Sequence, residues 1–324
     1  MSGRCDLPIP NGWFAIAWSK DVAPGEVIKT HYFEQDLVVF RTESGKVNVL
    51  DAYCPHLGAH LGVGGTVVGE SLQCPFHAWR WNAEGSCVGI PYAKRIPPGA
   101  KMRSWRVQEL AGLILVWHHA EDAPPFFELP EMTEFDDPDW SEPDHFEMTI
   151  GAHVQDTNEN NCDPVHFKYV HESDNVPASE ISYQGLVMHM ESESDYESEF
   201  GTFTTRLVRD AFGIGLVAVR IVGIPECGLL MFSSTSPITR EKSCSRWVFM
   251  TTKNLYDTAG KEFISKFQEG VTQDFPIWEN KIHRRDPLLC EEDDMLAEYR
   301  RWASNFYGSG PNGAHLRRAD AGGE

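Results

Sequence analysis

The sequence lacks a long apolar run. The best candidate for a membrane span, residues 212–232, is interrupted by Arg220, Pro225 and Glu226 and divides into pieces of strand length. The N-terminal segment MSGRCDLPIPNGWFAIAWSK has no continuous apolar core between a basic start and a small-residue cleavage site, so we expect no secretory signal. These absences predict a cytoplasmic protein without a membrane span.

Basic residues and cysteines are also scarce. Lys and Arg number 28 against 48 Asp and Glu, and the formal net charge of −20 argues against a nucleic-acid or anionic-membrane surface. Eight cysteines are too few for a disulfide framework in 324 residues. Two interpretations stay open for them, which are reduced thiols and metal ligands. The length allows one large domain or two ordinary ones.

The first third of the chain has a strand-like, turn-rich pattern. LVVF and VNVL flank RTESGK, which predicts a hairpin, and LILVW (113–117) predicts a buried strand. The next segment, 121–144, has ten acidic residues, five prolines and no lysine or arginine. Because such a composition cannot form a core, we expect an extended linker between two domains.

Strands and then helices are expected after this segment. Residues 181–255 have the pattern of several strands, and alternating acids predict one solvated strand face rather than a cation site. These acids are Glu191, Glu193, Asp195, Glu197 and Glu199. The spacing of Phe263, Phe267, Val271 and Phe275 predicts a helix over 261–283, and Asp286-Pro287 predicts the start of a second.

The tail, residues 308–324, is rich in Gly, Ala and polar residues and is expected to be disordered. Gly308, Gly310 and Gly313 match G-x-G-x-x-G, but no strand precedes them, so no nucleotide site is predicted. If the chemistry needs NAD(P)H, another protein must bind it.

The strongest motif pairs C-x-H with C-x-x-H. Cys54 and His56 are separated by seventeen residues from Cys74 and His77. Two thiolates and two imidazoles on two loops suit a [2Fe–2S] cluster in which histidines replace cysteines on one iron. The alternative is a zinc site, but zinc sites usually pair Cys with Cys and His with His. The mixed pairing therefore favours the cluster.

Residues 13–117 resemble the Rieske domain of ring-hydroxylating oxygenases, including the stretch CPFHAWRWN. Respiratory Rieske proteins have a further disulfide-forming cysteine in each loop, whereas Ala59, Ala78 and Trp79 stand here. The resemblance implies a cluster near the low end of the Rieske range of roughly −150 to +300 mV, suited to reducing an oxygen-activating iron. It implies an α+β fold, with a Rieske domain at 1–120, the linker at 121–144 and a helix-grip catalytic domain at 145–307.

A second metal site is expected around NNCDPVHFKYVH (160–171). Asp163 before Pro164 also fits a plain helix start, and His166 and His171 lie about 140° apart on a regular helix. Both histidines can reach one ion only if His171 lies where the helix ends. The spacing D-x-x-H-x-x-x-x-H resembles the iron motif of Rieske oxygenases, in which two histidines and one carboxylate hold Fe(II).

The resemblance implies the remaining roles. By position Asp274 in QDFPIWENK is the third ligand, with Glu279 as the alternative, and Pro276 predicts a kink beside it. Asp163 would link the Rieske histidine of a neighbouring subunit in a homotrimer to His166. Asn160 would lie near the iron.

Residues 273–307 look like the C-terminal end of 3-ketosteroid 9α-hydroxylase oxygenase components, which cholesterol desaturases share. The resemblance implies a terminal oxygenase that uses O₂ and electrons from a separate NAD(P)H-dependent reductase or ferredoxin to hydroxylate a steroid or similar apolar polycyclic substrate. Sterol desaturation and demethylation are the alternatives within this chemistry. A large Rieske electron carrier without a second iron is the alternative from another class.

Overall fold

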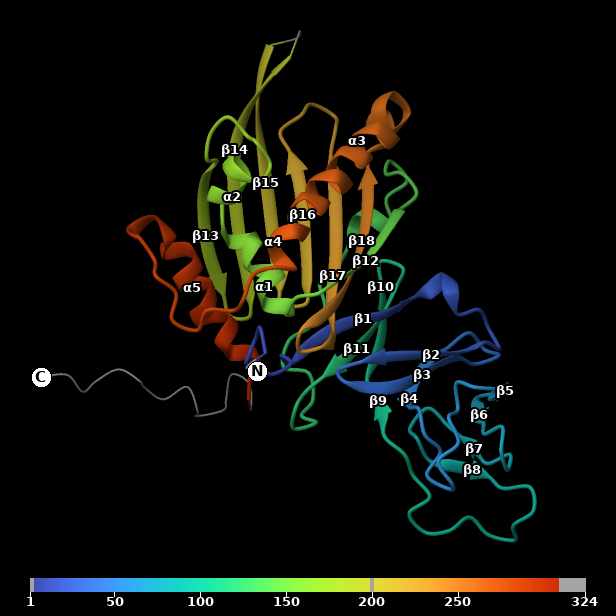
Figure 1. The fold of residues 1–324 in the computed structure, drawn as a ribbon. Helices are drawn as coiled ribbons and strands as arrows, with labels where there is room; N and C mark the ends of the chain where they lie inside the picture. The colour runs from blue at the N-terminus through green and yellow to red at the C-terminus, as the bar shows by residue number, and fades with distance from the viewer. Residues whose placement is uncertain (1–2, 199–200, 309–324) are drawn as a thin grey trace, which may run out of the picture. The chain divides into compact units, whose positions relative to one another are not determined.

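The computed structural model describes residues 3–198 and 201–308 (Figure 1). Its internal contacts divide the chain into two compact units. The small unit is Phe14–Trp117, and the large unit comprises the residues up to Trp13 and those from His118 onward. We describe each unit by itself.

The small unit consists of short strands in three sheets. Their orders are β1-β11-β10, β2-β3-β4-β9 and β5-β6-β7-β8. The first sheet contains β1 (Gly12–Trp18), β10 (Val107–Leu110) and β11 (Leu113–His118), and a 3₁₀ turn, η1 (Ser19–Asp21), follows β1. The second contains β2 (Val27–Tyr32), β3 (Gln35–Arg41), β4 (Val47–Asp51) and β9 (Ser104–Trp105). The third contains β5 (Thr66–Val68), β6 (Ser71–Gln73), β7 (Arg80–Trp81) and β8 (Cys87–Gly89).

Both strand predictions for this unit are confirmed. LVVF and VNVL lie in β3 and β4, which pair antiparallel with Leu37 opposite Asp51. LILVW is β11, and its residues from Leu113 to Trp117 are all buried. Continuous apolar runs occur here because a strand covered on both faces has no side that needs polar residues.

The large unit is a seven-stranded antiparallel sheet with helices on one face (Figure 1). The strand order is β12-β18-β17-β16-β15-β14-β13. The strands are β12 (Asp144–Ile150), β13 (Ala178–Gln184), β14 (Val187–Ser198), β15 (Gly201–Phe212), β16 (Leu216–Val222), β17 (Leu229–Thr239) and β18 (Lys242–Thr251). Six of them, β13 to β18, pair in sequence order as successive hairpins, so the sheet is built mainly from local pairings.

Short helices join the first strand of this sheet to the second, and longer ones follow the last. The first group is α1 (Val154–Asn158), η3 (Glu159–Cys162) and α2 (Val165–Tyr169). The second is α3 (Lys253–Gln273), α4 (Phe275–Trp278), η4 (Glu291–Asp293), α5 (Asp294–Ala303) and η5 (Ser304–Phe306). Figure 1 shows α1 to α4 over one face of the sheet and α5 beside β13.

The ends of both C-terminal helices differ from the prediction. Helix α3 begins eight residues earlier than expected, directly after β18, and stops at Asp274. Pro276 lacks the N–H that would continue the ladder, so the predicted break is confirmed. The start predicted at Asp286-Pro287 was wrong, because α5 begins at Asp294. Leu288 is fully exposed, so no packing stabilises an earlier turn there.

The acidic segment 121–144 packs on the large unit. It is irregular apart from the 3₁₀ turn η2 (Thr133–Phe135). Met132 and Glu134 are buried, and Glu134 accepts from Nε of Arg220 on β16 at 2.5 Å. Phe127 packs edge-on against Phe306, with 6.1 Å between the ring centroids. These contacts attach the segment to the sheet and to the C-terminal end of the chain.

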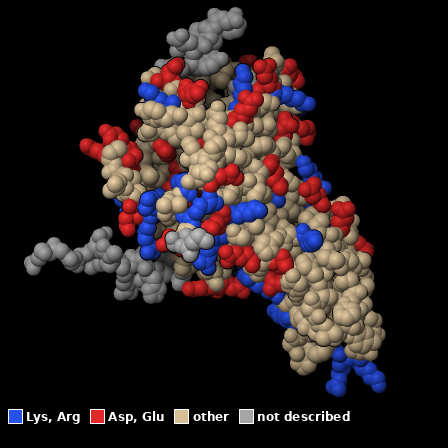
Figure 2. All heavy atoms as spheres, in the orientation of Figure 1, with Lys and Arg blue, Asp and Glu red and all other residues tan. Residues whose placement is uncertain are grey.

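The alternating acids lie on β14. Met188 and Met190 are buried, whereas Glu191 is half-buried and Glu193 is exposed, as expected for one solvated face. The side chains of Asp195, Glu197 and Glu199, and the predicted tail from residue 309 on, lie outside the described residues. Figure 2 shows acidic side chains spread over the visible face with basic ones between them. Among the described helices none is long and apolar enough to cross a membrane.

Candidate metal centres

The two loops that carry C-x-H and C-x-x-H have the same backbone turn. Cys54 N–H donates to the Ala59 carbonyl at 2.9 Å, and Cys74 N–H donates to the Trp79 carbonyl at 2.8 Å. The fourth residue after each cysteine returns an N–H to that cysteine's carbonyl, at 2.9 Å from Gly58 and 3.1 Å from Ala78. Both of these residues have positive φ, 74° and 55°. Each loop therefore fixes its cysteine by two backbone hydrogen bonds.

These turns bring two thiols and two imidazoles together. Cys54 and Cys74 are buried, and burial, together with the neighbouring Cys74, raises the pKa of Cys54 to about 11. The His56 and His77 rings lie 4.7 Å apart, and His56 stacks on Trp79 at 4.5 Å. Nδ1 of His77 is buried without a hydrogen-bond partner. An imidazole nitrogen in that position is available as a metal ligand.

The spacing of these ligands distinguishes a cluster from zinc. A single tetrahedral zinc holds its ligands at about 2.0–2.3 Å, so all four lie within about 4 Å of one another. Among the described residues, the groups of three or more with ligand atoms within 4.8 Å of one another are Cys5–Asp156–His283 and His166–His171–Asp274. The cysteines and histidines of the two loops are too far apart to be such a group. They fit a centre with two metals, in which each metal takes one pair of ligands.

A glycine is required in the tight turn that follows the first loop. A Cβ on Gly65 would lie 2.1 Å from the Leu61 carbonyl oxygen, so any side chain there would displace backbone.

No disulfide joins any of the eight cysteines, all of which lie in the described part of the chain. The loops therefore have no cross-link like that of respiratory Rieske proteins.

In the large unit, Asp163 lies two residues before α2 and His171 lies just beyond its end. Oδ1 of Asp163 accepts from the backbone N–H of Val165 at 2.9 Å and of His166 at 3.3 Å, so the capping role is confirmed. The last bond of the helix is Val170 N–H to the His166 carbonyl, at 2.7 Å. His171 follows this bond and turns back, so its ring lies 5.0 Å from that of His166. His171 therefore lies where the helix ends, which is the condition for both histidines to reach one ion.

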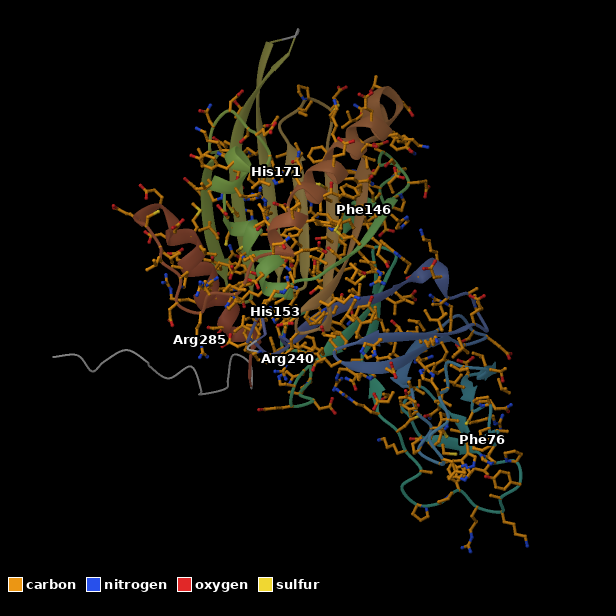
Figure 3. The ribbon with its side chains drawn as sticks, in the orientation of Figure 1. Phe76, Phe146, His153, His171, Arg240 and Arg285 are labelled. Atoms are coloured by element: carbon orange, nitrogen blue, oxygen red, sulfur yellow. The ribbon has the colours of Figure 1, made fainter. Side chains whose placement is uncertain are left out.

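Asp274 joins the two histidines at the break between α3 and α4. Its Oδ2 lies 3.5 Å from Nε2 of His171, and one ligand atom from each of the three residues lies within 4.8 Å of the others. Asp274 is only 6% exposed, whereas Glu279 is exposed and is not part of this group. Figure 3 shows His171 on the helical side of the sheet. Two imidazoles and one carboxylate could hold a ferrous ion with coordination positions left open.

Both histidines are oriented through their other ring nitrogen. Nδ1 of His166 donates to the Asp163 carbonyl at 2.5 Å, and Nδ1 of His171 donates to Oε1 of Gln273 at 2.8 Å. Each bond uses Nδ1 and leaves Nε2 of its ring as the nitrogen available to a metal. Burial lowers the pKa of His166, and a hydrogen bond to Asp274 raises that of His171. The sequence analysis missed Gln273, although its position next to Asp274 was a usable indication.

Asp163 and Asn160 lie beside this group. The Asp163 carboxylate is 41% exposed, and its Oδ2 is 3.9 Å from Nδ1 of His166. The His166 ring donates instead to the backbone carbonyl of Asp163. Asn160 lines the adjoining cavity, where its Oδ1 accepts from Nε1 of Trp278 at 3.3 Å.

The cavity has a volume of about 450 Å³ and is lined by the three grouped residues. Its floor is one face of the sheet, since β17 contributes Met231, Ser233 and Thr235 and β18 contributes Ser245 and Trp247, at alternate positions. From the helical layer the lining residues include Phe267, Gly270, Val271 and Trp278. A pocket of this size accommodates a drug-sized or larger apolar molecule.

Two family models match the chain. The Rieske [2Fe–2S] domain matches residues 12–106, and the 3-ketosteroid 9α-hydroxylase C-terminal domain matches residues 116–307. The chain belongs to the Rieske oxygenases of the 3-ketosteroid 9α-hydroxylase type. Members of this group are oxidoreductases with a Rieske cluster, a mononuclear iron and O₂ as co-substrate, and the predicted α+β fold is confirmed. An electron carrier without a catalytic domain is not supported.

Two kinds of curated protein are among the relatives of this Rieske oxygenase. Cholesterol 7-desaturase nvd 1 of Ciona intestinalis is 31% identical over 93% of this chain and 70% of its own. The 3-ketosteroid-9-alpha-monooxygenase oxygenase component of Mycolicibacterium smegmatis is 32% identical over 91% of this chain and 82% of its own.

Solved structures share the fold. NdmB of Pseudomonas putida CBB5 is similar with a TM-score of 0.75 and 17% identity, covering 90% of this chain and 89% of its own. Dicamba monooxygenase has a TM-score of 0.73 and 17% identity, covering 92% and 96%. At these identities the likeness concerns the fold alone.

Proposed function

We propose that this Rieske oxygenase hydroxylates a steroid or a similar apolar polycyclic substrate. The observation that carries the proposal is the largely apolar cavity of about 450 Å³ directly beside His166, His171 and Asp274. Relatives of both kinds are at least 30% identical to this chain, and their names include a sterol or a steroid. Desaturation is the second candidate reaction, because the cholesterol 7-desaturases match as well as the monooxygenases do.

His166, His171 and Asp274 are the proposed ligands of the mononuclear iron, which when bound supplies open coordination positions for O₂ beside the substrate. The Asp163 carbonyl and the Gln273 amide keep the two rings in the ligating tautomer. The aromatic residues of the cavity wall would exclude water once substrate is bound.

Cys54, His56, Cys74 and His77 are the proposed ligands of the [2Fe–2S] cluster, which receives electrons from a separate NAD(P)H-dependent reductase or ferredoxin. Leu57 and Phe76, next to the two histidines, are 63% and 60% exposed and offer an apolar rim for docking. The cytoplasmic location stays a prediction.

The proposed route to the iron crosses a subunit boundary in a homotrimer. Asp163 supports this role because its carboxylate is 41% exposed, so a histidine of a neighbouring subunit can reach it. The same residue holds His166 through its backbone carbonyl. Asp163 is thus placed to couple an incoming imidazole to a ligand of the iron.

Turnover with a surrogate reductase against a steroid panel tests the proposal, with products identified by mass spectrometry. We expect a product heavier by one oxygen, and a product lighter by two hydrogens would indicate desaturation instead. Iron counting tests the enzyme class separately from the substrate. About three irons per chain are expected for an oxygenase and two for an electron carrier. Three irons without product from any steroid would refute the substrate and leave the enzyme class intact.

A further inference from the structure

A buried arginine without a carboxylate partner faces the cavity. Arg209 on β15 lines it and is only 4% exposed. One guanidinium nitrogen, Nη1, donates to Oγ of Ser192 at 3.1 Å, while Nη2 is buried with no hydrogen-bond partner. Its Cζ lies 5.0 Å from the Phe167 ring centroid. No ion pair joins Arg209 to a carboxylate in the described part of the chain.

Other arginines of the large unit are paired with acids. Arg246 pairs with Glu147 at 2.8 Å, and Arg300 pairs with Glu159 at 2.8 Å. Burial lowers the pKa of Arg209 to about 10, so its side chain is still a cation at neutral pH. A buried cation that lacks a counter-ion destabilises the fold. Such a group is retained when a ligand supplies the missing charge.

Arg209 is also close to the proposed iron ligands. The Phe167 ring, which contacts Arg209, also packs at 4.4 Å from the His166 ring and at 5.2 Å from the His171 ring. Asp274 is the buried carboxylate of the cavity lining, and its Oδ2 already lies beside Nε2 of His171. Lys266 and Glu269 also line the cavity, but both are exposed and their charges offset each other. With a ferrous ion bound, the positive charges of the ion and of Arg209 would exceed the single negative charge of Asp274 in the cavity interior.

We propose that Arg209 binds a carboxylate of the substrate, so that the natural substrate is an acidic polycyclic molecule. The inference rests on the proposed function and narrows its substrate class. A carboxylate that reaches the guanidinium would pair with the unpartnered Nη2 and neutralise the charge with short charge-assisted hydrogen bonds. A neutral keto oxygen would satisfy the donor and leave the charge uncompensated. Because Arg209 shares a contact with Phe167 beside the proposed iron ligands, the oxidised carbon would lie toward the acidic end of the molecule.

Binding of a matched pair of probes to the metal-loaded full-length protein tests this inference. The probes are a four-ring steroid whose side chain ends in a carboxylic acid and its methyl ester, measured by equilibrium dialysis. We expect the acid to bind about ten- to a hundred-fold more tightly than the ester. Equal affinities would overturn the inference and leave the polycyclic substrate standing. If neither probe binds, the polycyclic substrate itself is wrong, and the inference falls with it.

Variants assign the preference to this side chain. In Arg209→Met the acid should lose its advantage while the ester keeps its affinity, and Arg209→Lys should retain part of the advantage. Arg206→Met is the matched control, because Arg206 lies on the same strand, is exposed and pairs with Glu191 at 3.2 Å. An advantage that survives in Arg209→Met would refute the role, as would an equal loss for acid and ester. The wild-type comparison decides the outcome even if a variant does not fold.

Discussion

Replacing Gln273 by Leu removes the acceptor that orients His171 and should weaken iron binding at the mononuclear site. Outer-sphere partners of this kind are worth about 10- to 100-fold in metal affinity, or about 1.4–2.7 kcal/mol. Gln273 is exposed, so water can take the place of its amide oxygen, and we expect the lower end, about tenfold. Glu at this position keeps an acceptor oxygen and should restore the affinity.

The assay is Fe(II) affinity measured by chelator competition, with the visible absorption of the cluster as an internal reference. Gln268→Leu is the matched control, since Gln268 lies on the same helix and does not line the cavity. An affinity for Gln273→Leu within about twofold of the wild type would refute the reasoning, because the orienting bond would then contribute less than about 0.4 kcal/mol. A loss of cluster absorption would point to a general folding defect instead.

Three further predictions concern residues in other places. Asp163→Asn should leave both metal sites loaded and abolish turnover, so full steady-state activity would contradict its coupling role. Asp274→Ala should lower the iron content from about three to about two per chain with cluster absorption unchanged, whereas Glu279→Ala should keep three; an unchanged count in the first variant would remove Asp274 from the ligand set. Glu159→Gln should lower the free energy of unfolding by about 2 kcal/mol in urea titration, since it leaves half-buried Arg300 without its carboxylate partner; a change under about 0.5 kcal/mol would contradict this.

Much of the secondary structure and the cluster motif could be predicted from local patterns in the sequence. The hairpin β3–β4, the strand β11 and the cap at Asp163 each depend on residues within a short stretch, where periodicity and turn chemistry act directly. The cluster motif is local in the same sense, because each loop contributes two proposed ligands that lie two or three positions apart along the chain.

Features that depend on tertiary packing were not predicted. Gln273 reaches His171 from 102 residues away, and no periodicity links them. Arg209 would be expected at the surface from its neighbours alone, because which face of β15 is inward depends on the strands beside it and on the helices above. The start of α5 was wrong for a related reason, since the local Asp-Pro pattern was not supported by anything for Leu288 to pack against.

The matching turns at Cys54–Ala59 and Cys74–Trp79 have a consequence for the rate of electron transfer. A redox centre exchanges electrons quickly when its ligands keep their positions in both oxidation states, because little reorganisation energy is then needed. Two backbone hydrogen bonds lock each cysteine, and they do so in the same way on both loops. Both loops thus hold their cysteines by the same pair of backbone bonds, which would keep the ligand positions nearly unchanged when the charge on the centre changes.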